Sequence, residues 1–291
     1  MSFTLVLNSS NVSNTSTNTS FKYNFIQGGF AVKDMEMCVS SITLPYSFYN
    51  VSSYYNNRTF SLIFPTGSTT TTIAVTLPEG FDTVTDINSY IQQVCIDYGA
   101  YLIDSTGNYV YYQQLVYNTT YYAVQLLLFS VPTTLPTGYS YATAGASGSI
   151  YTTSAKLPTT AYVPRFYLAS SGSIATIIGF TAGATYPTAV TTTSQSLSST
   201  SVPVGSTVNS LIMQCSLINN PVTFPSDILD SMPINDTSFG SNIIYQPYPN
   251  FVSLSNGTFN NFTFSFRDQN LNEIYARDSN VSITLIIRQK K

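Results

Sequence analysis

The fold is decided by four short stretches near the C-terminus: SLIMQCSLINN at residues 210–220, FGSNIIYQP at 239–247, FSFRDQN at 264–270 and SITLIIR at 282–288. Each stretch holds a short run of β-branched or aromatic residues, and Asn, Pro, Gly or Asp separate the runs. Runs punctuated in this way are typical of an antiparallel β-sandwich or barrel. The C-terminal part of the chain is therefore predicted to be all-β.

The beginning of the chain has the same pattern. Residues 21–25, FKYNF, alternate apolar and polar side chains, which predicts a half-buried strand. Residues 35–44 predict another strand, which ends at Pro45. The two ends of the chain are therefore expected to contribute strands to one β domain.

The middle of the chain differs. Residues 60–64 and 72–77 flank the turn sequence Pro65-Thr66-Gly67-Ser68, which predicts a hairpin. A helix is predicted over Asp86–Tyr98, with Thr85 or Asp82 as its cap and Gly99 as its end. Its apolar residues recur at helical spacing, and they are Ile87, Tyr90, Ile91, Val94, Cys95 and Tyr98.

Further strands are predicted at residues 101–104, 110–117 and 121–131, and low-complexity loops at 133–161 and 188–205. We therefore predict a discontinuous β domain formed by residues 1–55 and 190–291. A small α+β domain, residues 56–189, is inserted into it.

The composition indicates a surface that partners cover. Charged residues make up 8% of the 291 residues, whereas a freely circulating monomer is normally kept soluble by more charge. The chain also has 23 tyrosines, a residue that is enriched at interfaces. In the pairs Tyr54-Tyr55, Tyr111-Tyr112 and Tyr121-Tyr122, one ring is expected to fill the core and the other to face a partner.

The sequence offers no catalytic or cofactor-binding residues. The chain has no His, the commonest acid–base and zinc-binding side chain, and it lacks a Walker-type loop, a Gly-x-Ser-x-Gly elbow and an HExxH motif. We predict that it is not an enzyme and that it binds no metal and no cofactor. Cys38, Cys95 and Cys215 are odd in number and widely spaced, so buried, reduced thiols are expected instead of disulfides.

Acidic residues were the remaining candidates for chemistry. Oxygen ligands alternate at Asp268, Asn270, Asn272 and Glu273, a weak likeness to a calcium loop that lacks the required Gly. A polar hairpin turn is the preferred interpretation. Caps and turn residues, not catalytic carboxylates, are expected at Asp227, Asp230 and Asp236.

The charge pattern and the lengths of the apolar runs indicate whether the chain binds nucleic acid or contacts a membrane. The net charge is −3, and Arg288, Lys290 and Lys291 form the one basic cluster, so weak or no contact with nucleic acid is expected. No segment approaches the ~20 apolar residues of a membrane span, and the N-terminus does not resemble a signal peptide. We therefore expect no membrane contact and synthesis in a cytosol-like compartment.

Ile26-Gln27-Gly28-Gly29-Phe30 is similar to the sites that adenovirus-type maturation proteases cut. Because it lies between two predicted strands, and Gly-Gly is an ordinary turn sequence, we favour a turn.

Three segments, in this order and spacing, resemble the penton (minor capsid) proteins of virophages and polinton-like viruses. They are residues 21–49 with Ser-Ile-Thr-Leu-Pro-Tyr-Ser at 41–47, residues 75–94 with Leu-Pro-Glu-Gly-Phe at 77–81, and residues 211–288. The sequences Ile177-Ile178-Gly179-Phe180 and Tyr186-Pro187 add to the resemblance.

The resemblance implies a mainly β fold, a single jelly-roll β-sandwich with an inserted small α+β domain. It also implies homopentamers that close the fivefold vertices of an icosahedral double-jelly-roll capsid. The implied partners are other copies of the chain, the neighbouring major capsid protein and a host receptor contacted through the insertion. The implied location is the virion, after assembly in the host cytoplasm.

Two alternatives stay open. A receptor-binding or fibre-head protein of a virus would also be rich in β-strands, Tyr, Thr and Ser, and a homotrimer would favour it. A β-sandwich hydrolase would be favoured by a bound metal or a cleft lined by carboxylates.

Overall fold

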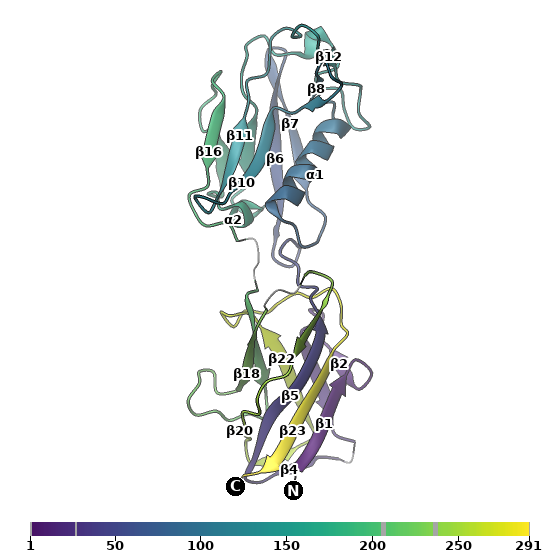
Figure 1. Cartoon of the computed structure of the whole chain (residues 1–291), viewed down its shortest axis with the longest axis vertical. Coiled ribbons are helices and arrows are strands. Elements are labelled where there is room, and N and C mark those ends of the chain that lie inside the picture. Colours follow the sequence, from purple (N-terminus) through teal and green to yellow (C-terminus); the bar gives the residue numbers. More distant parts are fainter. Residues whose placement is uncertain (1, 27, 205–207, 235–237, 291) are drawn as a thin grey trace. The chain divides into compact units, whose positions relative to one another are not determined.

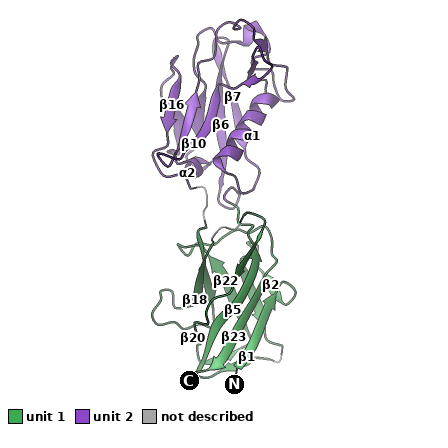
Figure 2. Cartoon of the chain, in the orientation of Figure 1, with its two compact units in different colours: residues 1–49, 206–291 green, residues 50–205 purple. Residues whose placement is uncertain are grey.

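A computed structural model describes residues 2–26, 28–204, 208–234 and 238–290. The chain divides into two compact units, which Figure 2 colours separately: unit 1 is residues 1–49 with 206–291, and unit 2 is residues 50–205. Each unit has its own hydrophobic core, and the two clusters of buried residues share no member. The chain therefore leaves one core, builds a second one, and returns to the first.

Unit 1 consists mainly of two antiparallel sheets around its core (Figure 1). The first sheet has the order β1-β23-β5-β19, and β20 also pairs with β5. Its strands are β1 (Ser2–Asn8), β5 (Met35–Pro45), β19 (Asn242–Tyr245), β20 (Val252–Ser253) and β23 (Ser282–Gln289). The second sheet has the order β18-β17-β22-β3-β2. Its strands are β2 (Val12–Asn14), β3 (Ser20–Asn24), β17 (Ser210–Cys215), β18 (Ile228–Pro233) and β22 (Asn261–Arg267), and β4 (Phe30–Val32) pairs separately with β21 (Gly257–Phe259).

The strand pairs of unit 1 are nested. The first strand, β1, pairs with the last, β23. Further inward, β3 pairs with β22, β5 pairs with β19, and β17 pairs with β18. Among these eight strands the chain changes sheet at every connection except the one between β17 and β18, where neighbouring strands of one sheet follow each other. The unit is thus a two-layer β-sandwich in which strands far apart in sequence lie side by side.

Alternating side chains explain why these segments form strands. In β23, Ile283, Leu285 and Ile287 are buried, and the residues between them are not. In β22, Phe264 and Phe266 are buried, and Phe266 lies edge-to-face with Phe21 of the neighbouring β3 at 6.1 Å between ring centroids. The period of two places one face of each strand in the core, so the strand predictions for residues 21–25 and 282–288, and for a strand within 210–220, are confirmed.

The described residues of unit 2 form three sheets. The largest holds β6 (Asn57–Thr66), β7 (Thr69–Thr76), β13 (Arg165–Leu168), β14 (Gly172–Ser173) and β15 (Ala184–Tyr186). A second holds β10 (Gln113–Asn118), β11 (Ala123–Leu128) and β16 (Gln195–Ser198), and a third holds β8 (Leu102–Ile103), β9 (Tyr109–Val110) and β12 (Ser140–Tyr141). Two short helices are η1 (Ser154–Lys156) and α2 (Ala175–Ile178). The hairpin predicted around Gly67 is present as β6 and β7.

The predicted helix is α1 (Val84–Asp97), and its buried face includes Ile87, Ile91 and Val94 as predicted. The cap is Thr83, so both proposed caps, Thr85 and Asp82, are wrong. The Thr83 side chain accepts from the Asp86 backbone N–H, and the Asp86 carboxylate accepts from the Thr83 N–H, which makes a reciprocal capping box. The helix contacts β10, whose Leu115 N–H donates to the Asn88 side chain at 2.9 Å.

The divisions between the units lie at 49/50 and 205/206, not at the predicted 55/56 and 189/190. Residues 195–198 form β16, which pairs with β11 and places Leu197 against the core of unit 2. At the other division, Val51 is fully buried in that same core. β16 was not predicted because its sequence is rich in Ser and contains only one apolar residue, Leu197.

The predicted turn at residues 105–108 depends on Asp104. One carboxylate oxygen accepts the backbone N–H groups of Thr106 and Asn108, each at 2.9 Å, and the hydroxyl of Thr106. Gly107 has φ +88°, a conformation that glycine adopts without strain. These hydrogen bonds favour the ionised form, with the Thr106 hydroxyl as the first cause, and lower the pKa of Asp104 to about 2.

We expect Ile91→Asp to destabilise unit 2 by several kcal/mol, on the order of the cost of burying an unpaired carboxylate. Ile91 is 1% exposed in α1. Ser89→Asp, which adds the same carboxylate at an exposed position of the same helix, is the control and should unfold like the wild type. Chemical denaturation followed by circular dichroism measures both. Equal stability of the two variants would show that the helix face is misassigned.

We expect the turn at Asp104 to loosen only in strong acid. Because the folded-state pKa is lowered, the contribution of the carboxylate is fully present above about 3.9, the ordinary Asp value, and is lost as the pH falls through about 2. In an NMR titration the amide signals of Thr106 and Asn108 should shift with a midpoint near 2. A midpoint near the ordinary value would contradict the hydrogen-bonding account.

Candidate interaction surfaces

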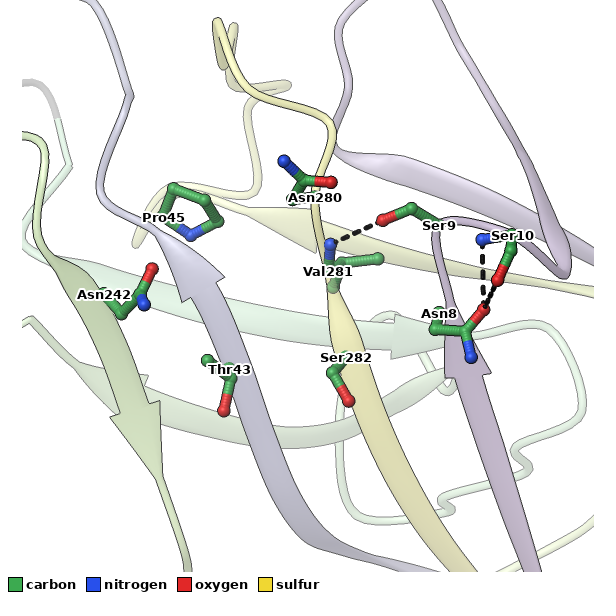
Figure 3. A pocket seen from close by; sticks show the side chains of 9 residues that line it. All are labelled: Asn8, Ser9, Ser10, Thr43, Pro45, Asn242, Asn280, Val281 and Ser282. Atoms are coloured by element: carbon green, nitrogen blue, oxygen red, sulfur yellow. Dashed lines mark hydrogen bonds between the residues drawn. The ribbon is translucent and has the colours of Figure 1, made fainter.

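A hollow of about 530 Å³ lies at one end of the first sheet of unit 1 (Figure 3). The residues that line it are Asn8, Ser9, Ser10, Thr43, Pro45, Asn242, Asn280, Val281 and Ser282. None of them is acidic or basic, so no side chain there can act as a general base toward the serines. Ser9 Oγ accepts the Val281 N–H at 3.0 Å, and Asn8 Oδ1 accepts from Ser10 N at 3.0 Å. The hollow therefore offers hydrogen-bonding groups for contact and no reactive pair.

The turn at Asp268 has the polar arrangement that we preferred to a calcium loop. Asp268 Oδ1 accepts the N–H groups of Asn270 and Asn272 at 2.8 Å each, and its Oδ2 accepts Asn272 Nδ2 at 3.0 Å. Glu273 Oε1 accepts the hydroxyl of Thr17 at 3.0 Å. The carboxylates thus hold loops together, in the way that Asp104 does in unit 2. In the part of the chain that the structure describes, no three acidic or Cys side chains could hold a metal ion together.

Asp227 and Asp230 also have structural partners. Asp227 Oδ1 accepts Gln214 Nε2 at 3.0 Å. Asp230 accepts the hydroxyl of Tyr245 at 3.3 Å, which links β18 at the edge of one sheet to β19 at the edge of the other. Burial raises the pKa of Asp230, and burial together with Asp230 raises that of Tyr245. Sequence reasoning missed this link because nothing in the sequence relates the two positions. Asp236 lies outside the described residues.

The Gly-Gly segment between β3 and β4 has turn conformations, with φ +78° at Gly28 and +143° at Gly29. Ile26 before it is 92% exposed, and Gln27 lies outside the described residues. A methyl group on Gly29 would approach the Thr258 side chain to 3.0 Å, so the backbone needs glycine there. These glycines fit the preferred interpretation as a turn.

The basic C-terminal cluster is smaller than the sequence indicated. Arg288 Nε lies 2.6 Å from Glu36 Oε1, and the guanidinium lies 3.4 Å from the centre of the Phe251 ring. Arg288 is therefore held within unit 1 by its ion pair and its ring contact. Lys290 is exposed, and Lys291 lies outside the described residues.

All three cysteines are buried and free, as predicted. Burial raises the pKa of Cys95 and of Cys215 to about 12, so both stay protonated at neutral pH. Protonated, buried thiols are poor nucleophiles, so these residues act as small apolar side chains in the core.

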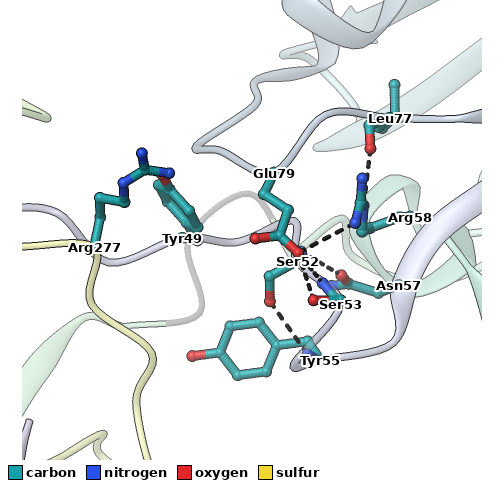
Figure 4. A network of polar contacts seen from close by, with 9 residues as sticks. All are labelled: Tyr49, Ser52, Ser53, Tyr55, Asn57, Arg58, Leu77, Glu79 and Arg277. Carbon is teal, nitrogen blue, oxygen red and sulfur yellow. Dashed lines mark hydrogen bonds and ion pairs between the residues drawn. The ribbon is translucent and has the colours of Figure 1, made fainter. Parts of the chain in front are cut away.

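Leu77 and Glu79, in the segment 77–81 that is part of the resemblance to penton proteins, take part in a network of polar contacts (Figure 4). Glu79 Oε1 accepts the Ser53 N–H at 2.9 Å and forms an ion pair with Arg58 Nη1 at 3.1 Å. Arg58 Nε in turn donates to the Leu77 carbonyl at 2.8 Å. Gly80 exchanges backbone hydrogen bonds with Val51. These contacts therefore hold the segment before α1 against the first residues of unit 2.

Asn50, the first residue of unit 2, is fully buried and adds to these contacts. Its Nδ2 donates to the Asp82 carbonyl, and its Oδ1 accepts the Asp82 N–H, both at 2.8 Å. Asn57 Nδ2 donates to the Asn50 carbonyl at 2.7 Å. The chain therefore enters unit 2 through a fixed hydrogen-bonded junction.

One side of unit 1 exposes large apolar side chains, which we name the apolar side patch: Val222 (88% exposed), Phe224 (97%), Ile244 (68%) and Tyr248 (96%). They belong to β19 and to the loops that follow β17 and β19. Both loops lie along the same edge of the sandwich, because Asn219 N donates to Ser253 O and the Tyr245 hydroxyl reaches Asp230. Residues 237–266, which include Ile244 and Tyr248, contain no charged residue, although Asp227 and Asp230 belong to the same edge. The lack of charge was the signal that sequence reasoning could have used.

Unit 2 exposes tyrosine. A hollow of about 450 Å³ is lined by Tyr109, Val110, Tyr111, Tyr112, Gln114 and Phe129. Burial, with smaller effects of Cys95 and the neighbouring tyrosines, raises the pKa of Tyr111 to about 12. At the turn between β10 and β11, Tyr121 is 74% and Tyr122 61% exposed, so the prediction that one ring of each pair fills the core is wrong there. The reason is that Asn118 turns the chain before β11 begins at Ala123.

In the described part of the chain, no helix is long and apolar enough to cross a membrane. No family model matches the chain, and no curated protein matches it. Among solved structures, the crystal structure of SeMet-labelled mavirus penton protein matches with 9% identity and a TM-score of 0.39, over 99% of this chain and 100% of that chain. A match at this level assigns no family to the chain.

Proposed function

We propose that this chain is a structural capsid protein, a penton that forms homopentamers at the fivefold vertices of an icosahedral double-jelly-roll capsid. Unit 1 is the single jelly roll that builds the ring, and unit 2 is the inserted domain. The observation that carries the proposal is the nested strand order of unit 1. The proposal also draws on the sequence resemblance of residues 21–49, 75–94 and 211–288 to penton proteins.

The strand order supports a jelly roll for a topological reason. A jelly roll is eight strands in two four-stranded sheets, formed by rolling up nested antiparallel pairs. In unit 1 the pairs β1–β23, β3–β22, β5–β19 and β17–β18 are nested in this way. Unit 2 interrupts the chain between the third and the fourth of these strands, β5 and β17.

The apolar side patch supports self-association. A closed ring needs two different surfaces that meet between neighbouring copies. The patch offers one such surface, because aromatic residues are enriched at interfaces and its aromatic and aliphatic side chains are exposed in the single chain. A side contact that holds a ring should bury more than about 1,000 Å². The neighbouring major capsid protein would contact the remaining surface of unit 1.

Unit 2 is proposed to meet what lies outside the vertex, including a host receptor. Inserted modules and loops on a rigid scaffold commonly carry recognition. The exposed Tyr121 and Tyr122 and the tyrosine-lined hollow at Tyr109 give this unit surfaces of the kind that bind partners. No catalytic role is proposed for either unit.

The same tyrosines support one alternative, a receptor-binding or fibre-head protein of a virus. In that case a trimer, not a pentamer, would be the assembled form. The copy number of the assembly separates the two functions.

Substituting the apolar side patch should weaken the ring without unfolding the chain. Phe224→Asp combined with Tyr248→Asp places charges at side chains that are 97% and 96% exposed in the single chain, so the melting temperature should not change. Dilution followed by sedimentation velocity should show at least about tenfold weaker assembly. The control is Val190→Asp, at a 57% exposed position of unit 2, which should assemble like the wild type. Equal assembly of all three proteins would remove the patch from the interface.

Replacing residues 50–205 with a short Gly/Ser linker should give a soluble unit 1 that still forms pentamers, because its core takes no residue from unit 2. Host infection by particles carrying this variant should fail. The matched comparison replaces only residues 56–189. This variant should be less stable, because it keeps Val51 and Leu197 but removes the core against which they pack. An aggregated product from the longer replacement would contradict the independence of unit 1.

A further inference from the structure

The strand β7, sequence TTTTIAVT, forms an open edge of the largest sheet of unit 2. It pairs with β6 over its whole length without a bulge, and no other strand lies beyond it among the described residues. The two strands are joined by a two-residue turn, Gly67-Ser68, which closes on the pair Thr66 and Thr69. Such a turn closes on a hydrogen-bonded pair, and hydrogen-bonded and open pairs then alternate along the ladder.

This alternation decides which groups face the open edge. Thr69, Thr71, Ile73 and Val75 bond to β6, so Thr70, Thr72, Ala74 and Thr76 direct their N–H and C=O groups outward. Two contacts agree with this assignment: Leu77 N donates inward to Arg58 O, and the Tyr90 hydroxyl reaches Thr76 O from outside at 3.3 Å. No hydrogen bond within the described chain reaches the outward groups of Thr70, Thr72 and Ala74. The side chains of all three residues are exposed.

Two other edge strands of this protein, β1 and β18, are protected. At β1, the Asn11 side chain occupies the edge: its Nδ2 donates to Val6 O and its Oδ1 accepts from Asn8 N, both at 2.8 Å. At β18, the register shifts by a bulge opposite Met213 and Gln214, and the Tyr245 hydroxyl donates to Ser231 O at 3.2 Å. Bulges and side-chain caps are the usual devices against unwanted strand pairing.

The remaining edge strands among the described residues are shorter than β7, and the longest of them, β10 with six residues, has its Leu115 N–H occupied by the Asn88 side chain. β2 and β15 have three residues each, and Pro187 follows β15 directly. β7 has eight residues and no Lys, no Pro and no bulge, and residues 59–78 contain no charged residue. β7 is therefore the longest described edge strand, and the open N–H and C=O groups of Thr70, Thr72 and Ala74 suit it to binding.

We propose that the open edge of β7 is a strand-addition site, which takes an extended, uncharged segment of a partner polypeptide as an additional strand of the sheet. The unpaired groups of Thr70, Thr72 and Ala74 would supply the main-chain hydrogen bonds, as in β-augmentation. The neutral edge favours a neutral segment, since a charge placed in this ladder would lose hydration without gaining an opposite charge. The buried row of Ile73 and Val75 favours apolar side chains at alternate positions of that segment.

The choice of a partner over a second copy of β7 rests on the proposed function. Pairing of β7 with β7 of another copy would create a twofold, isologous contact. A ring of five copies closes through heterologous contacts, so neighbours in the ring cannot satisfy each other's β7 edges in this way. Pairing of β7 with β7 therefore does not close this edge within the proposed ring, and we assign the edge to another polypeptide.

The test uses a fluorescein-labelled peptide, Thr-Val-Thr-Val-Thr-Val with a solubilising lysine tail, and a matched peptide with Pro at its third Thr. The wild-type full chain should bind the first peptide saturably in fluorescence polarisation and should not bind the second. Thr72→Pro removes one outward N–H and leaves the ladder to β6 intact, so binding should weaken at least about tenfold. Thr72→Val keeps the backbone N–H and should bind like the wild type.

Hydrogen exchange provides a second measurement that does not depend on a variant. Peptide binding to the wild type should slow amide exchange at Thr70, Thr72 and Ala74 and leave Thr71 and Ile73, which already bond to β6, unchanged. Absence of wild-type binding, or equal binding by Thr72→Pro, would overturn the proposal. The wild type could instead form assemblies larger than the ring, and Thr72→Pro could abolish them. That result would show that β7 pairs with a second copy of the chain, and it would overturn the proposal of a different partner. If the peptide binds as expected but the protein forms no pentamer, the strand-addition site is upheld and only the proposed function is contradicted.

Discussion

The antiparallel ladder between β1 and β23 is the constraint on which unit 1 depends. It joins Ser2 to Arg288 and Asn8 to Ser282, so the two ends of the chain have to meet before the first sheet is complete. Every other pair in unit 1 is nested inside this one, down to the local hairpin of β17 and β18. The free-energy cost of closing a loop grows only slowly with its length. An insertion of unit 2's size is therefore tolerated between β5 and β17, provided that it folds around its own core.

A second theme is the way the protein replaces charge with amide and hydroxyl groups. Two ion pairs are present among the described residues, Arg58–Glu79 and Arg288–Glu36. Side-chain amides form many of the other structural hydrogen bonds. Asn11 covers the edge of β1, Asn50 holds the start of unit 2, and Asn88 connects α1 to β10. Neutral hydrogen bonds of this kind keep loops in place without placing charges on the surface. A surface of this kind can approach other subunits with little desolvation cost.

Sequence alone predicted the parts of the fold in which a single local pattern decides the outcome. The alternation in residues 282–288 and the helical spacing of Ile87, Ile91 and Val94 gave a strand and a helix where the structure has them. β16 was missed because Gln195–Ser198 carries one apolar residue, and its pairing with β11 is a tertiary choice. The ion pair of Arg288 with Glu36 was missed for the same reason, since the two residues meet only through the register of β23 and β5.

The candidate surfaces were less predictable than the fold. The excess of tyrosine indicated interfaces, but it did not separate Tyr112, which is buried, from Tyr121, which is 74% exposed. The apolar side patch arises because two loops far apart in sequence follow the same edge of the sandwich. Which groups of β7 face its open edge depends on the residue pair that closes the hairpin turn. The sequence Gly67-Ser68 identifies that pair only once the pairing of β6 and β7 is known. Positions that depend on which strands become neighbours cannot be read from local patterns.

The central claim, that unit 1 is a ring-forming jelly roll, is tested most directly by the symmetry of the assembled full-length protein in cryo-electron microscopy. The account predicts fivefold class averages in which neighbouring copies of unit 1 lie side by side with their strands roughly along the axis, and in which the apolar side patch is buried at each contact. Threefold averages, or particles whose contacts leave Phe224 and Tyr248 exposed, would contradict it.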